Sequence, residues 1–321
     1  HWPFCHAIED LHLPGVPVHE DFAAVFLATG GELASVLQTE WKIDPAEILD
    51  VLHPRTDGPA LRLLRSILSG PIDIDKMDYL ERDSLHAGVP YGRNFDRDRL
   101  IHALVLNQAG DGLALSSKGK TAAELMVFAR YVMFSEVYWH HAVRAGTCMF
   151  SRSFAALVPS LDLDQLFRQG EAEFIRTLQE AAQGTAVASL LDGVFGSSRR
   201  LHKRVLEFSH AQEPALYGAL AGRPYRELWE LNDRLTARVA ERLGRPLSPT
   251  AILIDAPPVQ KEVEFQIDIY SSKTREYRPL QHVSPVVAAL ARTQFDDHVK
   301  RVRIFAEASL RPARDTIATV L

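Results

Sequence analysis

The strongest fold signal in the chain is the stretch Gly70-Pro71-Ile72-Asp73-Ile74-Asp75-Lys76-Met77-Asp78-Tyr79-Leu80-Glu81-Arg82-Asp83. On a helix, Asp75, Tyr79 and Arg82 fall near one face, and Lys76, Tyr79 and Asp83 also lie close together. These side chains offer a carboxylate to a metal, an ammonium to a phosphate, and a tyrosine with a carboxylate to a sugar. The alternative is a solvated charged helix with surface ion pairs.

A second motif opens the chain: His1-Trp2-Pro3-Phe4-Cys5-His6, followed by Glu9 and His19. Glu9 comes three residues after His6, one helical turn along, so its carboxylate can accept a hydrogen bond from a nearby ring nitrogen. A carboxylate that orients a histidine also favours the protonated ring that a general acid needs. Three histidines around a Pro-Phe turn favour a site, and the alternative is that they cap or line a core.

A third segment, residues 130–141, predicts an apolar, aromatic helix that also carries cationic groups. Arg130 and His141 follow one stripe of that helix, and Tyr138 and His140 flank it. Burying a cation without a partner is costly, so these groups need an anion or an acidic side chain. A substrate anion and an internal ion pair both satisfy this need.

Hydrophobic periodicity predicts a mainly α protein. Residues 1–105 and 162–245 have helical spacing, and a long helix is expected from Thr121 to about Val158, with a bend at Gly146. Residues 101–118 contain Ala-Gly-Asp-Gly between leucine-rich flanks, which predicts a β-hairpin.

The end of the chain has a different pattern. Strands are expected at residues 251–254, 263–270 and 302–305, and a helix from Ser284 to about Val299. We therefore expect a helical domain over residues 1–245, with the hairpin as an insertion, and a small C-terminal α+β module over residues 247–321.

Composition limits the function classes. The 321 residues include 36 Lys+Arg and 41 Asp+Glu, a net charge of −5, which argues against binding nucleic acid by bulk charge. Apolar runs are shorter than the roughly 18 residues of a membrane span, so no membrane partner is expected. The two cysteines, Cys5 and Cys148, are too few for a disulfide framework and favour the cytoplasm. Because His1 stands inside a motif, we expect further residues upstream.

Together these segments resemble the HD-domain phosphohydrolases, in particular the deoxynucleoside triphosphate triphosphohydrolase-like branch. The chain begins at the second histidine of that family's His-Asp-Ile-Gly-His-x-Pro-Phe-Ser-His pattern, with Cys5 in place of the serine. Residues 70–83 fit its Gly-x-x-Asp-x-Asp-Lys-x-Asp-Tyr-x-x-Arg-Asp run, and residues 130–140 fit its Arg-x(7)-Tyr-x-His helix. The resemblance is strongest over residues 1–145.

The resemblance implies a role for each matching residue. Asp75 is implied as a metal ligand, with three further ligands upstream of His1. The implied catalytic group at the scissile phosphate is His1, His6 and His19, with Glu9 orienting His19. The implied substrate-binding side chains are Lys76, Arg130, Tyr138 and His140 for the phosphates, and Tyr79 and Asp83 for the sugar.

The resemblance also implies the reaction. A divalent metal (Mn, Fe, Mg or Zn) polarises a water, a histidine protonates the departing oxygen, and a dNTP becomes a deoxynucleoside and tripolyphosphate. A nucleotide is the implied partner, within a homo-oligomer. Two alternatives remain: an HD hydrolase of another phosphate ester, and a catalytically inactive nucleotide-binding regulatory protein.

Overall fold

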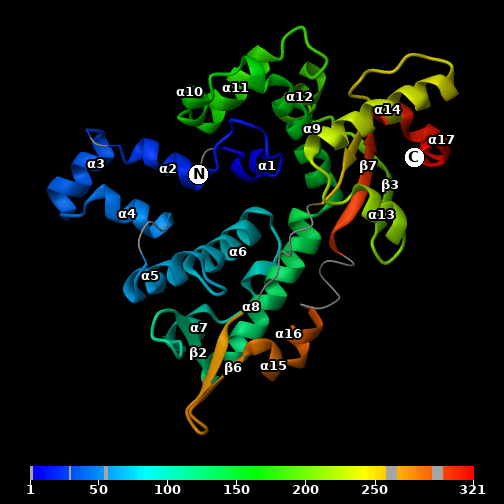
Figure 1. Cartoon of the computed structure of the whole chain (residues 1–321). Coiled ribbons are helices and arrows are strands. Elements are labelled where there is room, and N and C mark those ends of the chain that lie inside the picture. The colour runs from blue at the N-terminus through cyan, green and yellow to red at the C-terminus, as the bar shows by residue number, and fades with distance from the viewer. Residues whose placement is uncertain (1–2, 29, 54–56, 258–265, 291–298) are drawn as a thin grey trace. The chain divides into compact units, whose positions relative to one another are not determined.

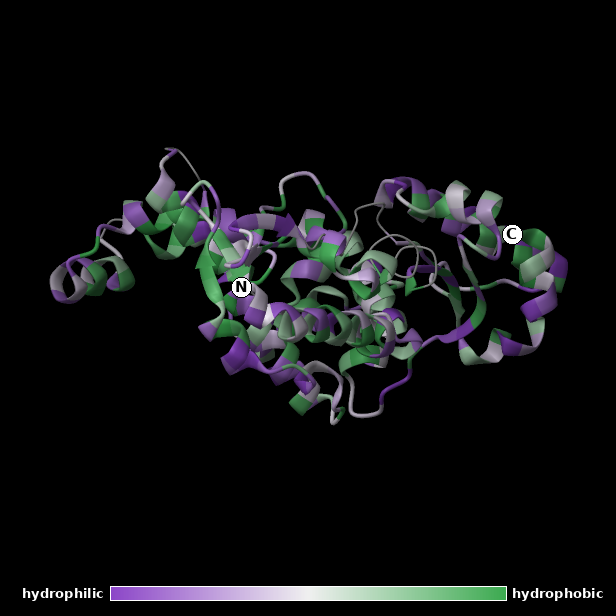
Figure 2. Ribbon diagram, turned by 90° about the horizontal axis from the view of Figure 1, so that it is seen from below, coloured by the Kyte–Doolittle hydropathy of each residue, from purple (hydrophilic) through white to green (hydrophobic). Residues whose placement is uncertain are grey.

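The computed structural model describes residues 3–28, 30–53, 57–257, 266–290 and 299–321. Helices dominate these residues and the strands are short (Figure 1), so the expected mainly α fold class is confirmed. Many of the ribbons carry both hydrophobic and hydrophilic segments (Figure 2), as amphipathic elements around a core do.

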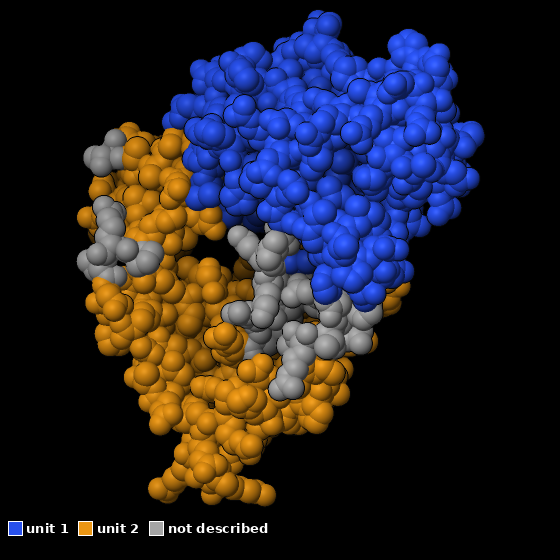
Figure 3. Space-filling view, turned by 45° about the vertical axis from the view of Figure 1, so that its right-hand side comes forward, with its two compact units in different colours: residues 1–19, 139–260, 300–321 blue, residues 20–138, 261–299 orange. Residues whose placement is uncertain are grey.

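The chain forms two compact units, each built from separated segments (Figure 3). Unit 1 comprises residues 1–19, 139–260 and 300–321, and unit 2 comprises residues 20–138 and 261–299. The expected domain boundary near residue 246 stays a prediction. Strands from the region after that boundary contribute to both units.

The first part of unit 2 is helical. Its helices are α2 (His19–Phe26, whose first residue belongs to unit 1), α3 (Glu32–Val36), η1 (Leu37–Trp41), α4 (Pro45–Leu52), α5 (Pro59–Ser69), α6 (Ile74–His86), η2 (Tyr91–Arg93), α7 (Arg97–His102), η3 (Ser117–Gly119), α8 (Lys120–Met133) and η4 (Phe134–Tyr138). Local capping explains where two of them begin. Asp44 and Glu47 form a capping box at α4, and the Asp73 carboxylate accepts a hydrogen bond from the Lys76 backbone N–H at α6, at 2.7 Å.

Unit 2 also holds a four-stranded sheet in the order β1-β2-β5-β6, formed by β1 (Leu104–Leu106), β2 (Leu113–Ser116), β5 (Asp268–Ser271) and β6 (Glu276–Pro279). β1 and β2 pair antiparallel, which confirms the expected hairpin. β5 pairs parallel to β2, with Leu115 opposite Ile269. The strand expected at residues 263–270 begins at Asp268, and residues 263–265 lie outside the described residues.

Two short helices, α15 (Leu280–Val283) and α16 (Pro285–Ala289), follow in unit 2. The Ser284 side chain accepts a hydrogen bond from the Val287 backbone N–H, so α16 begins where expected. Residues 291–298, within the helix expected to reach about Val299, lie outside the described residues.

Unit 1 packs helices around a second sheet. Its helices are α1 (Cys5–Glu9), α9 (His141–Leu157), η5 (Val158–Ser160), α10 (Leu163–Phe167), α11 (Glu171–Ala181), α12 (Ala188–Phe195), α13 (Pro214–Leu220), α14 (Tyr225–Leu243), η7 (Ala308–Ala313) and α17 (Arg314–Val320). The sheet has the order β3-β7-β4 and contains β3 (Lys203–Ser209), β7 (Arg301–Ala306) and β4 (Ile252–Asp255). The expected strands at 251–254 and 302–305 are thus confirmed. The central strand, β7, is buried from Val302 to Ala306, and this stretch includes the charged residue Arg303.

The structure corrects two expectations. Residues 162–245 are not helical throughout, because residues 203–209 form β3 and pair with β7. The helix expected from Thr121 to Val158 is not one helix, although α9 runs without interruption through Gly146. It is interrupted after Tyr138, where η4 ends and His140 adopts ψ 136 and accepts a hydrogen bond from the Ala142 backbone N–H at 3.3 Å. In the part of the chain that the structure describes, no helix has both the length and the apolar character needed to cross a bilayer.

Candidate functional site

Glu9, the last residue of α1, connects two of the expected catalytic histidines in unit 1. Its Oε1 atom accepts a hydrogen bond from the His19 backbone N–H at 2.5 Å and lies 2.7 Å from His19 Nδ1. Its Oε2 atom lies 3.5 Å from His6 Nδ1. The side chains of Glu9 and His19 are 16% and 13% exposed, whereas that of His6 is 74% exposed. One carboxylate therefore holds a half-buried histidine beside an exposed one.

The hydrogen bond at His19 assigns the tautomer. A carboxylate is only an acceptor, so Nδ1 of His19 must carry the proton that it shares with Glu9. In the neutral ring the lone pair then lies on Nε2. A second proton, when bound, is therefore held at Nε2.

Local backbone geometry brings His19 back to α1. Gly15 has φ 79, a left-handed conformation that glycine adopts without strain, in a loop where Pro14 and Pro17 restrict their own backbone. Before α1, Phe4 has φ 60, and its ring packs 4.9 Å from that of Phe150. The aromatic packing anchors the start of the helix that carries Glu9.

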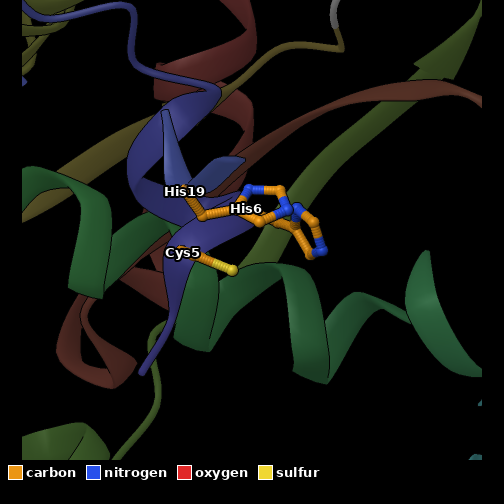
Figure 4. Close-up of side chains that lie close together, drawn as sticks. All are labelled: Cys5, His6 and His19. Atoms are coloured by element: carbon orange, nitrogen blue, oxygen red, sulfur yellow. The ribbon is translucent and has the colours of Figure 1, made fainter. Parts of the chain in front are cut away.

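Cys5 adds a thiol to the same region. Cys5 Sγ and one ring nitrogen each of His6 and His19 all lie within 4.8 Å of one another. Figure 4 shows the three side chains close together. Cys5 is 5% exposed, so the sulfur lies on the buried side of the cluster.

Four of the expected substrate-binding residues gather in unit 2. The Tyr138 hydroxyl donates a hydrogen bond to Asp83 Oδ2 at 2.8 Å, and the Tyr79 and Tyr138 rings meet at 6.3 Å in a T-shaped arrangement. The Arg130 guanidinium lies 5.5 Å from the centre of the Phe134 ring. These residues come from α6, α8 and η4 and form a polar cluster with aromatic walls.

Both tyrosines of this cluster are neutral hydrogen-bond donors at physiological pH. Burial raises the pKa of Tyr138 well above its usual value, and the hydrogen bond to Asp83 raises it further. Burial also raises the pKa of Tyr79, while the charge of Arg130 opposes this.

Lys76 makes a contact that sequence analysis missed. Its Nζ donates to Asp73 Oδ2 at 2.5 Å and to the Gly70 carbonyl at 3.0 Å, and Asp73 is 1% exposed. Lys76 thus holds the turn that opens α6. An aspartate three residues before Lys76, at a helix start, was the available signal.

Asp75, in the first turn of α6, is exposed. Divalent cations in proteins take about four to eight ligands, and one carboxylate supplies one or two of them. In the described ranges, no group of three possible ligands includes Asp75. These residues therefore do not by themselves make up the metal site that the resemblance implies.

Two expected residues remain, His140 and His1. His140 belongs to unit 1, is exposed at the start of α9, and its ring lies 4.3 Å from that of His141. His1 lies outside the described residues.

Sequence analysis did not anticipate a cavity of about 540 Å³ in unit 1, lined in part by Arg144 and Asp255. The two side chains form a bidentate ion pair, with Nη2–Oδ1 at 2.6 Å and Nε–Oδ2 at 3.1 Å. Burial opposes the charge of Arg144, but the Asp255 carboxylate keeps its pKa above the usual value. Two sequence signals for this ion pair were available. Arg144 stands on the apolar helix after His141, and Asp255 directly follows the apolar run 251–254.

The chain is similar to one protein family and to several known proteins. A family model described as the HD associated region matches residues 95–318, more than half of the chain. The uncharacterized protein YwfO of Bacillus subtilis is 31% identical over 153 residues, which are 47% of this chain and 33% of that protein. The uncharacterized protein MJ1154 of Methanocaldococcus jannaschii is 26% identical over 229 residues, 70% of this chain and 47% of that protein.

A protein of Acanthamoeba polyphaga mimivirus named as HD domain-containing, L394, is 25% identical over 173 residues, 51% of this chain and 36% of that protein. The chain thus spans between 33% and 47% of the length of these curated relatives.

Two solved structures share the fold. A hypothetical protein from Aquifex aeolicus superposes with a TM-score of 0.72 at 23% identity, covering 99% of this chain and 76% of that one. A phosphohydrolase from Bacteroides thetaiotaomicron, BT4208, superposes with a TM-score of 0.65 at 20% identity, covering 96% of this chain and 76% of that one.

Proposed function

This chain belongs to the HD associated region family, and from that premise we propose that it works in a metal-dependent HD phosphohydrolase that converts a dNTP to a deoxynucleoside and tripolyphosphate. The coarse part of the proposal, an HD phosphohydrolase, is supported by the relative named HD domain-containing and the phosphohydrolase of similar fold. The nucleotide substrate rests on the resemblance of residues 70–83 and 130–140 to the triphosphohydrolase branch.

The observation that carries the proposal is the Glu9 carboxylate between His19 and His6, 2.7 Å from the first and 3.5 Å from the second. With Nδ1 bound to Glu9, a protonated His19 releases its other proton from Nε2 to the oxygen that leaves phosphorus. The negative charge of Glu9 stabilises the imidazolium before that transfer.

The cluster in unit 2 fits the other parts of a nucleotide. Asp83 accepts one hydrogen bond from Tyr138 and retains acceptor capacity for a sugar hydroxyl. The aromatic face of Tyr79 suits packing against deoxyribose, and the Arg130 guanidinium suits a phosphate. In this proposal Lys76 acts mainly by holding the start of α6.

Dependence on a divalent metal is part of the proposal because the family relation implies it. The bound metal would supply Lewis-acid activation of a water. Mn, Fe, Mg and Zn are the candidates, and the oxygen donor of Asp75 suits each of them.

The test is hydrolysis by the full-length gene product. It is incubated with each dNTP and Mn²⁺, and deoxynucleoside and tripolyphosphate are measured. We expect tripolyphosphate release, lost in His19→Asn and kept in His12→Asn, which changes an exposed histidine of the same loop. Turnover of other phosphate esters alone would favour a different HD hydrolase. Nucleotide binding without turnover would favour a regulatory protein.

We also propose that the protein is a cytoplasmic homo-oligomer. An apolar groove between α4 and α5 supports the oligomer, with Ile48, Val51, Leu52, Leu64, Ile67 and Leu68 as its lining. Neither Cys5 nor Cys148 is in a disulfide, as expected in a reducing compartment. Sedimentation equilibrium tests the oligomer, and a monomer at micromolar concentration contradicts it.

A further inference from the structure

We propose that Cys5, His6 and His19 form a binding site for a soft divalent cation such as Zn²⁺. Their donor atoms all lie within 4.8 Å of one another on α1 and at the start of α2 (Figure 4). This site is separate in its ligands from the metal site that the resemblance implies, because it does not include Asp75.

The donor set selects the metal. One thiolate and two imidazoles are typical zinc ligands, and a water completes four-coordination. With Zn–S near 2.3 Å and Zn–N near 2.0–2.1 Å, tetrahedral ligand atoms lie about 3.3–3.6 Å apart. The cluster must therefore contract by at most about 1.5 Å. His6 is 74% exposed, so its ring has room to rotate inward over the buried sulfur of Cys5.

Glu9 prepares His19 for this role. Metal-binding histidines commonly donate their other ring N–H to a carboxylate, which fixes the tautomer and makes the ligating nitrogen more basic. Glu9 Oε1 lies 2.7 Å from Nδ1 of His19, so in this site His19 would bind the metal through Nε2. On binding, the Cys5 thiol gives its proton to solvent and its sulfur bonds the metal, so binding weakens as the pH falls.

Occupancy of this site has a consequence that rests on the proposed function. A metal on His6 and His19 removes both rings from proton transfer, so Zn²⁺ inhibits hydrolysis when this site fills.

The test uses Co²⁺ alone as a spectroscopic probe of the full-length gene product after treatment with a chelator. Thiolate–cobalt bonding produces a charge-transfer absorption in the near ultraviolet, which an oxygen-rich site does not produce. We expect a saturable band in the wild type and in Cys148→Ser, which removes the chain's other thiol. Cys5→Ser should abolish the band, and Glu9→Gln should raise the dissociation constant by about 10–100-fold.

A band that persists in Cys5→Ser, that disappears in Cys148→Ser, or that never forms in the wild type would overturn the site. If circular dichroism shows that Cys5→Ser does not fold, X-ray absorption spectroscopy of the zinc-loaded wild type identifies the metal ligands instead. One sulfur and two imidazole nitrogens around zinc support the site, and a shell without sulfur rejects it.

Hydrolysis separates the two proposals. Zn²⁺ added to the Mn²⁺ reaction should inhibit the wild type at a concentration at least tenfold lower than it inhibits Cys5→Ser. If the protein hydrolyses no nucleotide but shows the cobalt band, the proposed function fails and the metal site stands.

Discussion

Replacing Glu9 with glutamine removes one negative charge beside His19 and leaves the side chain almost the same size. Hydrogen bonds to charged groups contribute about 1.5–3 kcal/mol and neutral ones about 0.5–1.5 kcal/mol, so each Glu9 bond loses about 1–1.5 kcal/mol. Glu9 makes two such bonds to His19, one to the backbone N–H and one to Nδ1. Only the bond to Nδ1 strengthens when the ring is protonated. The activation free energy of proton transfer should therefore rise by at least about 1–1.5 kcal/mol, which lowers kcat about tenfold.

An upper bound follows from the charges themselves. Two unit charges about 4 Å apart interact by about 4 kcal/mol at the effective dielectric constant near a protein surface, which corresponds to about a thousandfold. We therefore expect kcat for dNTP hydrolysis to fall between about 10-fold and about 1,000-fold in Glu9→Gln. The free energy of unfolding should fall by about 2–3 kcal/mol from the two weakened bonds.

The assay is kcat of the full-length gene product across pH, with urea unfolding of the same samples. Without the Glu9 carboxylate the His19 imidazolium loses its charged hydrogen-bond partner, so kcat should be lower than in the wild type throughout the pH range. Asp10→Asn is the matched control, because it removes an equal charge at the next, exposed residue. A loss of kcat below threefold in a folded variant refutes a role of Glu9 in proton transfer.

Three further predictions concern stability. Arg144→Met leaves the Asp255 carboxylate, 4% exposed, without its bidentate partner. The free energy of unfolding in urea should fall by about 3–5 kcal/mol, and adding Asp255→Leu should recover at least half of it; a loss below 1 kcal/mol contradicts this. Burial and the hydrogen bond to Asp83 raise the pKa of Tyr138. The folded state therefore favours the neutral tyrosine, and the stability that this contributes is complete below about pH 10 and is lost as pH rises further. Tyr138→Phe should flatten the alkaline side of the stability–pH curve, and an unchanged slope argues against it. Burial opposes ionisation of Glu207, but hydrogen bonds from Arg303, Arg204 and Arg301 lower its pKa to about 2. The ionised Glu207 therefore stabilises the folded protein above about pH 4.5, and this stabilisation is lost as pH falls to about 2. Glu207→Gln should flatten the acid side, and an acid side as steep as in the wild type contradicts this.

Short-range interactions account for what could be predicted well. The hairpin around Gly110 and the helix start at Ser284 depend on residues within a few positions of each other, and each formed where expected. The contact between Glu9 and His6 was likewise visible as one helical turn.

Interactions between distant residues account for what the local pattern missed. β3 has an ordinary local pattern and becomes a strand because β7, almost a hundred residues later, offers a full ladder of hydrogen bonds. The break before α9 forms because His140 leaves the helical conformation and caps the next helix, although helical periodicity runs on through that position.

The sequence by itself determined the helical character of this protein, its hairpin and the residue types of its candidate site, because capping, periodicity and turn chemistry act over a few residues. Only the tertiary structure decided that Glu9 bonds both the backbone N–H and the ring of His19, ten residues away, that Lys76 is paired with Asp73, and that a thiol lies beside the two histidines. These contacts depend on where loops and helix starts place side chains in space, to within an ångström, and no sequence spacing specifies that.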